Sequence, residues 1–164
     1  MRVADWTADG QALLALNLDS GALELLRASD GQRSEILRIK DRPIEMAALS
    51  PDGSAVALLA RGLLVGPSRM DGAADPNSFT TLADDAEDTI RWSPDGKAIY
   101  FISYADGPAC LWAARLGLPG DHRPVAHFHE PRRALLGSFD VSLNSLYLGI
   151  HETSGNLWVG NVRR

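Results

Sequence analysis

Histidine is the residue type in this chain whose spacing comes nearest to a chemical site. His127 and His129 lie two positions apart in an expected strand, so both side chains point to one face, about 6.6 Å apart along the strand. His151 and Glu152 follow in a later connection, and three imidazoles with a carboxylate can hold zinc. The spacing matches no established ligand motif, however, and favours polar residues on a surface strand and loop. We therefore predict no metal and no cofactor.

The sequence offers no apparatus for nucleophilic catalysis or nucleotide binding. Its single cysteine, Cys110, lies between an alanine and a leucine in an expected strand, where a small buried hydrophobic residue is usual. The segment nearest to the G-x-S-x-G nucleophile motif is GPSRM at 66–70, which lacks the second glycine. Neither G-x-G-x-x-G nor G-x-x-x-x-G-K-[ST] occurs. The chain is therefore expected not to be an enzyme.

Charge and hydropathy argue against two classes of partner. The 164 residues carry a net charge of −5, and acidic residues outnumber basic ones in both halves of the chain. No basic arm is therefore available for nucleic acid. No apolar run approaches the roughly 20 residues of a membrane-spanning helix, so membrane insertion is not expected. The opening MRVADWTADG lacks the apolar core of a signal peptide, which leaves a cytoplasmic protein or a fragment of a periplasmic one.

The elements that must position these residues come from an internal repeat. Four segments align: DWTADGQALLALN, AALSPDGSAVALLA, IRWSPDGKAIYFIS and FDVSLNSLYLGI. Their turns are marked by Asp9, Asp52, Asp95 and Asn144, at spacings of 43, 43 and 49 residues. A period near 43 suits one blade of a β-propeller, whose repeats run ~40–45 residues.

The local sequence of each repeat agrees with four short strands. In the SPDG turns, proline fixes φ and glycine accepts a positive φ, so Gly53 and Gly96 are expected there in the left-handed region. In the third repeat, strands are expected at 89–93, 97–103 and 109–116, and again at 123–129. The second strand of each repeat is apolar throughout, which indicates burial on both faces. A sandwich of short strands also spaces its turns regularly, but it does not require the same turn chemistry every 43 residues.

We therefore predict an all-β protein, a β-propeller segment of about four four-stranded antiparallel blades. Three blades are expected to be complete and the fourth to lack its outer strand. The chain forms one domain, 1–164, or part of one. The approximate blades are 1–43, 44–88, 89–136 and 137–164. Trp6 and Trp92 occupy the same repeat position and are expected to pack between blades.

The third repeat, WSPDGKAIYFIS followed by LWAARL, resembles the repeat of TolB-type, WD-like β-propellers. The second repeat keeps SPDG at 50–53, the first has Ala8 in place of proline, and the fourth keeps GNLW at 155–158 but has lost the turn. The resemblance implies a non-catalytic module for protein–protein interaction or ligand sensing, within a larger propeller or multidomain protein. It equally admits the gating propeller of a prolyl-oligopeptidase-like serine peptidase whose catalytic domain lies outside this chain. The repeat is structural in all these proteins, so it does not decide between them.

Charged loops enter the first strand of the later repeats. In a blade, the connections between repeats and the turns after the second strand emerge on the same side, so the loops at 41–43, 84–89 and 130–136 should share one face of the disc, opposite the SPDG turns. A protein or peptide partner is expected at this face, with Arg132 and Arg133 as carboxylate anchors. A solvated acidic loop is the plainer interpretation of 84–88. The candidate partner-binding residues are Asp41, Arg42, Asp84, Asp85, Glu87, Asp88, Glu130, Arg132 and Arg133.

An open arc of blades should expose its two ends. Each end blade is expected to present an apolar face, with Leu13, Leu14 and Leu16 at one end. Leu146, Leu148 and Ile150 are the corresponding residues at the other end. The segment is therefore expected either to belong to a longer chain or to self-associate through these ends, two copies giving about eight blades.

Overall fold

The computed structural model describes residues 1–69, 72–127 and 132–154. Within these residues the chain is almost entirely β-structure, arranged in three four-stranded sheets and one two-stranded sheet. No helix among them is long and apolar enough to cross a membrane. Each sheet is an antiparallel meander in chain order, which is the topology of a propeller blade.

The strands of the four sheets have the following bounds. The first sheet contains β1 (Arg2–Trp6), β2 (Ala12–Asn17), β3 (Ala22–Arg27) and β4 (Arg33–Leu37). The second contains β5 (Met46–Leu49), β6 (Ala55–Leu59), β7 (Leu63–Pro67) and β8 (Thr80–Ala83), with the short 3-10 helix η1 (Pro76–Ser78) before β8. The third contains β9 (Asp88–Trp92), β10 (Ala98–Ser103), β11 (Cys110–Arg115) and β12 (His122–Ala126). The fourth contains β13 (Arg133–Val141) and β14 (Leu146–Glu152).

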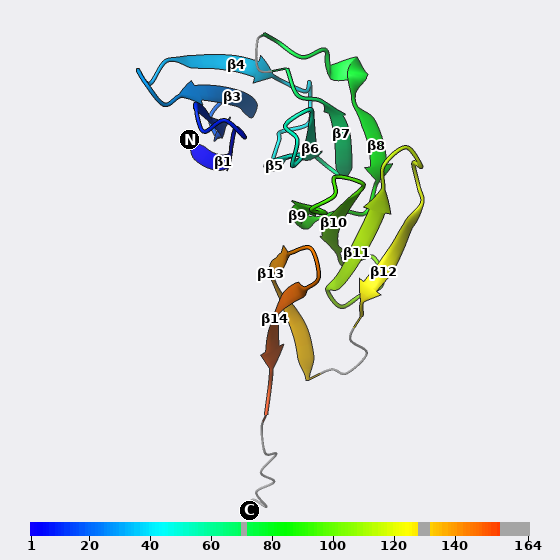
Figure 1. Ribbon diagram of the computed structural model, residues 1–164. Coiled ribbons are helices and arrows are strands. Elements are labelled where there is room, and N and C mark those ends of the chain that lie inside the picture. The colour runs from blue at the N-terminus through cyan, green and yellow to red at the C-terminus, as the bar shows by residue number, and fades with distance from the viewer. Residues whose placement is uncertain (70–71, 128–131, 155–164) are drawn as a thin grey trace, which may run out of the picture.

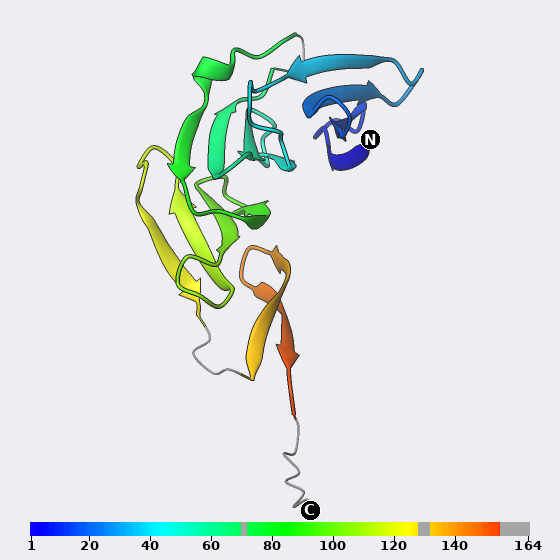
Figure 2. The ribbon, with the colours of Figure 1, turned by 180° about the vertical axis from the view of Figure 1, so that it is seen from behind.

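The sheets follow one another around an arc (Figure 1). Strands β1, β5, β9 and β13 lie along its inner side, and β4, β8 and β12 lie along its outer side, as the view from behind also shows (Figure 2). The prediction of an all-β propeller segment is thereby confirmed. The fourth sheet begins at Arg133, before the expected blade start at 137, because an irregularity between Leu135 and Phe139 lets β13 continue as one strand. The expected next strand of that blade lies outside the described residues.

The hydrophobic core lies between sheets rather than within one layer. Side chains alternate along a strand, so successive residues of β6 reach two different neighbours. Val56 and Leu58 pack in a cluster with the first sheet, whereas Ala57 and Leu59 pack in a cluster with the third. A smaller cluster joins the third and fourth sheets through Ile102 and other apolar residues. This is why the second strand of each repeat is apolar on both faces.

The turns and tryptophans give a mixed result. Gly53 and Gly96 have φ values of 72° and 69°, which confirms the left-handed turn positions. Trp92 is 8% exposed between the second and third sheets, as predicted, and its Nε1–H donates to the carbonyl oxygen of Ala48 at 2.9 Å. Trp6 is 54% exposed, so the prediction that it packs between blades is wrong within the described residues. No preceding sheet covers it there.

The two end faces also differ from expectation. Leu14 and Leu16 are fully buried against the second sheet, and only Leu13 points to the other side of β2. At the opposite end, Leu146 and Leu148 pack into the cluster with the third sheet. Because side chains alternate along a strand, Leu13 lies on the opposite face of β2 from Leu14 and Leu16. Leu146, Leu148 and Ile150 share one face of β14, but the first two pack against the third sheet and only Ile150 is largely exposed, at 45%.

Candidate partner-binding face

The turns that follow the inner strands gather on one face of the arc. A Cβ atom placed on Gly53 would lie 3.9 Å from the Cβ of Ala8 in the preceding turn. One placed on Gly96 would lie 3.8 Å from the Cδ of Pro51. The three turns at 7–11, 50–54 and 93–97 are therefore neighbours, and we term their surface the turn face.

The connections between sheets lie at the opposite ends of the same strands. The backbone N–H of Glu87 donates to the carbonyl oxygen of Ile102 at 3.0 Å, and that of Thr153 donates to Arg132 at 2.9 Å. A Cβ atom on Gly62, in the β6–β7 turn, would lie 2.8 Å from the carbonyl oxygen of Ala83. These contacts bring the connections together with the turns after the second strands. We term this surface the loop face.

Five of the candidate residues on the loop face are exposed charges without a partner among the described residues. Their side chains make no hydrogen bond or ion pair with any residue in the described part of the chain. They are Asp41, Arg42, Asp84, Glu87 and Arg132. Three carboxylates and two guanidinium groups are thus available on this face.

Arg61 is a further exposed charge on the loop face, outside the set of candidates predicted from the sequence. It is exposed at a φ of 53° in the β6–β7 turn, and its side chain has no polar partner in the described ranges. A Cβ atom on the next residue, Gly62, would lie 3.2 Å from the Cα of Asp84, so this turn adjoins the acidic connection. The Arg-Gly turn signal could have identified it, because turns after second strands share the side of the connections.

Three of the four remaining candidates already have partners. Asp88 accepts the backbone N–H of Thr89 at 2.7 Å, and Arg133 lies 3.7 Å from the carboxylate of Glu152. Asp85 accepts the hydroxyl of Ser103 at 3.1 Å. Glu130 lies outside the described residues. The nine candidate residues therefore include charges that hold the fold and charges that are free.

Asp85 belongs to a half-buried polar cluster whose residue types resemble those of a hydrolase triad. The Nε2 atom of His122 lies 3.6 Å from the Asp85 carboxylate, and its ring contacts Trp112 and Phe101 edge-on. Ser103 is completely buried, and its Oγ atom also accepts a backbone N–H.

The order of groups in this cluster rules out triad chemistry. In a triad, histidine lies between serine and the carboxylate and removes the serine proton. Here the Asp85 carboxylate lies between Ser103 and His122. The geometry therefore fixes the exit from the second sheet against the third and activates no nucleophile.

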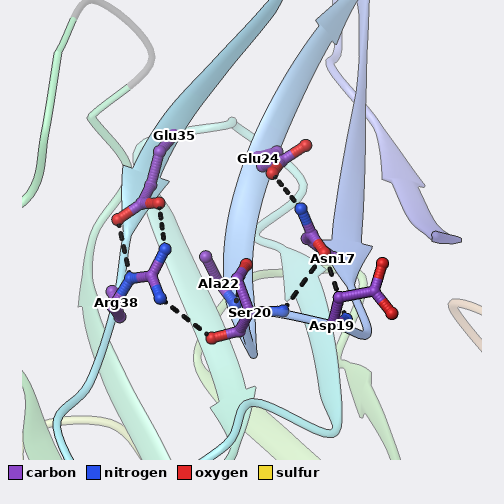
Figure 3. A network of polar contacts seen from close by, with 7 residues as sticks. All are labelled: Asn17, Asp19, Ser20, Ala22, Glu24, Glu35 and Arg38. Atoms are coloured by element: carbon purple, nitrogen blue, oxygen red, sulfur yellow. Dashed lines mark hydrogen bonds and ion pairs between the residues drawn. The ribbon is translucent and has the colours of Figure 1, made fainter.

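A second polar network anchors the start of the loop face at the first sheet (Figure 3). Asn17 accepts the backbone N–H of Asp19 at 3.1 Å and donates to Glu24 at 2.6 Å. Arg38 donates to both carboxylate oxygens of Glu35, at 3.1 and 2.6 Å, and to the carbonyl oxygen of Ser20. The hydrogen bonds from Arg38 lower the pKa of Glu35. The network fixes the position of Arg38, three residues before Asp41 in the connection to the second sheet.

On the turn face the aspartates are satisfied within their own turns. Asp9 accepts the Thr7 hydroxyl at 2.6 Å, and Asp95 accepts the Ser93 hydroxyl at 2.7 Å. Asp52 accepts the Ser50 hydroxyl at 2.6 Å and the backbone N–H of Ser54 at 3.0 Å. These hydrogen bonds lower the pKa of all three aspartates, that of Asp52 to about 2, with the seryl or threonyl hydroxyl as the largest cause in each case.

The turn face also contains a cleft that sequence reasoning missed. It has a volume of about 550 Å³, between the first two turns, and Leu49 and Arg27 contribute to its lining. The corresponding cleft between the second and third turns, which Trp92 lines, is about 350 Å³. Leu49 and Trp92 occupy the same repeat position, so the smaller side chain leaves the larger space.

The histidines and the carboxylate weighed above as a zinc site have other contacts among the described residues. His127 contacts the thiol of buried Cys110, and His151 Nε2 lies 3.0 Å from the Thr153 hydroxyl. Glu152 is the ion-pair partner of Arg133. No group of three or more potential ligands occurs in the part of the chain that the structure describes, and His129 lies outside it.

Comparison with known proteins supports the fold. Neither a protein-family model nor a curated protein matches the sequence. Among solved structures, the chain is similar to TolB from Acinetobacter baumannii, with a TM-score of 0.64 and 18% identity, covering 93% of this chain and 40% of that one. It is also similar to prolyl oligopeptidase B from Galerina marginata, with a TM-score of 0.58 and 15% identity, covering 89% and 25%. A prolyl endopeptidase gives a TM-score of 0.53 and 20% identity, covering 80% and 23%.

The chain thus spans less than half the length of each of these proteins. The similarity, with the three four-stranded meanders and the inter-sheet cores, assigns it the fold of a TolB-like β-propeller segment.

Proposed function

We propose that this chain is a non-catalytic propeller module whose loop face binds a protein or peptide segment. The observation that carries the proposal is the set of exposed charges on that face with no partner among the described residues. Two of these residues are tied to neighbouring strands by backbone hydrogen bonds: the N–H of Glu87 donates to Ile102, and the carbonyl oxygen of Arg132 accepts from Thr153. Such charges form charge-assisted hydrogen bonds and select partners by electrostatic complementarity.

The chemistry of the free groups indicates a partner that carries both signs of charge. Arg42, Arg61 and Arg132 can each anchor a carboxylate through two N–H donors. Asp84 and Glu87 accept hydrogen bonds from lysine or arginine. Of the two arginines expected to act as anchors, Arg132 is the stronger candidate, because Arg133 already contacts Glu152.

A peptide selection would test this function. The immobilised protein is offered a random-peptide library, and the selected peptides are measured by fluorescence anisotropy against wild type and Arg42→Glu/Arg132→Glu. We expect enrichment of peptides with acidic residues and about tenfold weaker binding to the double variant. Reversing two anchors replaces attraction by repulsion, so the loss should be larger at low salt.

The matched control changes the same net charge away from the loop face. Lys97→Glu/Arg123→Glu alters two exposed cations, one in a turn and one in β12. It should leave peptide affinity within about twofold of wild type, since distant exposed charges are screened. Equal losses in both double variants would show attraction to overall charge and would contradict a specific loop face.

The alternative is a propeller that gates a serine peptidase. The similarity to two prolyl peptidases supports the shared fold alone, because identity is 20% or less. This reading requires a G-x-S-x-G catalytic domain in the parent polypeptide. Coding sequence adjoining this segment decides it: such a domain would favour the gating role, and a kinase or winged-helix domain would favour a sensor.

A further inference from the structure

The first–second and the second–third sheet junctions share a contact at the ends of their inner strands, whereas the third and fourth sheets meet through the Thr89 hydroxyl, which donates to the carbonyl oxygen of Gly137. The last residue of β9, Trp92, donates its indole N–H to Ala48, the penultimate residue of β5, at 2.9 Å. The last residue of β5, Leu49, donates its backbone N–H to Asp5, the penultimate residue of β1, also at 2.9 Å. In both cases the final residue of the following inner strand contacts the penultimate residue of the leading one.

The first sheet carries the residue that makes this contact in a following sheet, and no sheet among the described residues receives it. Trp6 is the last residue of β1 and pairs with Leu13, just as Trp92 pairs with Ile99. Yet Trp6 is 54% exposed, and Val3 of the same strand is 56% exposed. The paired polar groups of Figure 3 come from β2, β3, β4 and the residues beside them, and none of them belongs to β1.

The fourth sheet carries the residue that corresponds to Asp5 and Ala48, the acceptors in these contacts. Asp140 is the penultimate residue of β13, and its Oδ1 atom accepts the N–H of Val141 at 2.9 Å, as Asp5 Oδ1 accepts that of Trp6 at 2.8 Å. The Oδ2 atom of Asp5 accepts the backbone N–H of Leu49 from the following inner strand. The Oδ2 atom of Asp140 has no partner in the described part of the chain. Asp5 thus demonstrates that a carboxylate fits between blades at this register.

The surface around Asp140 contains an exposed aromatic side chain and a shallow groove. Tyr147, which pairs with Asp140, is 61% exposed. A shallow groove of about 370 Å³ runs past these residues, with Ser138 and Gly149 also in its lining. A Cβ atom on Gly149 would lie 2.7 Å from the Ser138 hydroxyl, so glycine keeps the groove open.

We propose that a second copy of this chain docks its first sheet on the fourth sheet, as a following blade docks on a leading one. Trp6 of one copy takes the place that Trp92 has inside the chain and donates its indole N–H to the carbonyl oxygen of Asp140 in the other. The occupant is a second copy because one chain bears both complementary halves. Such a head-to-tail contact closes when both ends of two copies pair, giving about eight sheets, within the propeller range.

Analytical ultracentrifugation of the intact chain tests this contact. Wild type should sediment as a dimer whose population rises with concentration. Trp6→Glu and Tyr147→Glu should each be monomeric alone, because each lacks one end. An equimolar mixture of the two variants should form a dimer again, because it contains one intact Trp6 end and one intact Tyr147 end. Leu118→Glu, an exposed residue elsewhere, should behave as wild type.

Three outcomes would overturn the proposal. A wild-type monomer at every concentration excludes the second copy and favours blades from elsewhere in a parent chain. A dimer that survives both substitutions excludes these ends. If Trp6→Glu abolishes the dimer and the mixture of variants does not restore it, the contact is a symmetric one between two first sheets. Oxidative footprinting of wild type needs no substitution: Trp6 should become protected as dimer forms, and constant reactivity would contradict the contact.

Discussion

The turn face and the loop face use the same residue types for opposite purposes. On the turn face, Asp9, Asp52 and Asp95 accept hydrogen bonds from hydroxyl and N–H groups of their own turns. On the loop face, Asp84 and Glu87 have no such partners in the described ranges. A carboxylate whose oxygen atoms accept hydrogen bonds from its own turn stabilises the backbone conformation. A carboxylate whose oxygen atoms accept none can bind a donor group of a partner. The difference separates folding determinants from recognition candidates in one repeat.

The largest expected effect on stability concerns Trp92, which lines a cleft of the turn face and donates to the carbonyl oxygen of Ala48. Trp92→Ala should lower the free energy of unfolding by about 3–5 kcal/mol, because it leaves a cavity and strands the Ala48 carbonyl. Trp6→Ala, at the same repeat position, should cost less than about 0.5 kcal/mol in dilute monomer. Urea unfolding measures both. Similar losses would mean that repeat position, not burial, determines the contribution.

The next effect concerns the turn glycines. Gly53→Ala and Gly96→Ala should each cost about 1–2 kcal/mol, because a residue with a Cβ atom is strained at positive φ. Gly72→Ala is the matched control, since a Cβ atom there meets open space and its φ lies outside the left-handed region. Thermal unfolding compares the three variants. A harmless Gly53→Ala would contradict the role assigned to the turn face.

A smaller effect should follow pH. The pKa of Asp52 falls from 3.8 to about 2 on folding, so its ionised form stabilises the fold above about pH 4 and that contribution disappears as pH falls toward 2. The stability gap between wild type and Asp52→Asn should therefore narrow over this interval in urea titrations. A gap that stays constant over this interval would contradict the contribution assigned to Asp52.

The smallest expected effect is on the loop face. Asp84→Ala, Glu87→Ala and Arg132→Ala should each change the free energy of unfolding by less than about 0.5 kcal/mol, because no described contact is lost. Guanidinium unfolding measures these changes. A loss above about 1 kcal/mol would reveal a structural role and weaken the comparison between faces.

Much of the fold could be predicted from the sequence because blade formation is local. In the turns with a hydroxyl residue, aspartate and glycine, the side chains form hydrogen bonds within five residues of one another, so the local sequence is enough to predict each turn. The expected strand at 97–103 corresponds to β10 (Ala98–Ser103), and a run apolar on both faces predicted its burial between two sheets. The candidate face was predictable as a set of loops, because strand order decides on which side a connection emerges.

The individual roles at that face were not predictable. Asp84 and Asp85 are adjacent and chemically identical, yet only Asp85 meets Ser103 and His122, which come from other strands. Arg61 joins the face because its turn adjoins the next connection. These distinctions depend on residues far apart in the chain.

The sequence by itself determined the repeat, the turn conformations and the order of strands in each blade, since these depend on interactions among near neighbours. Only the tertiary structure decided which copy of a repeated residue is buried. Trp6 and Trp92 occupy equivalent positions, but burial requires a neighbouring sheet, and within the described residues only Trp92 has one. Likewise, the alternation of side chains in β2 became meaningful once the second sheet was in place to receive Leu14 and Leu16.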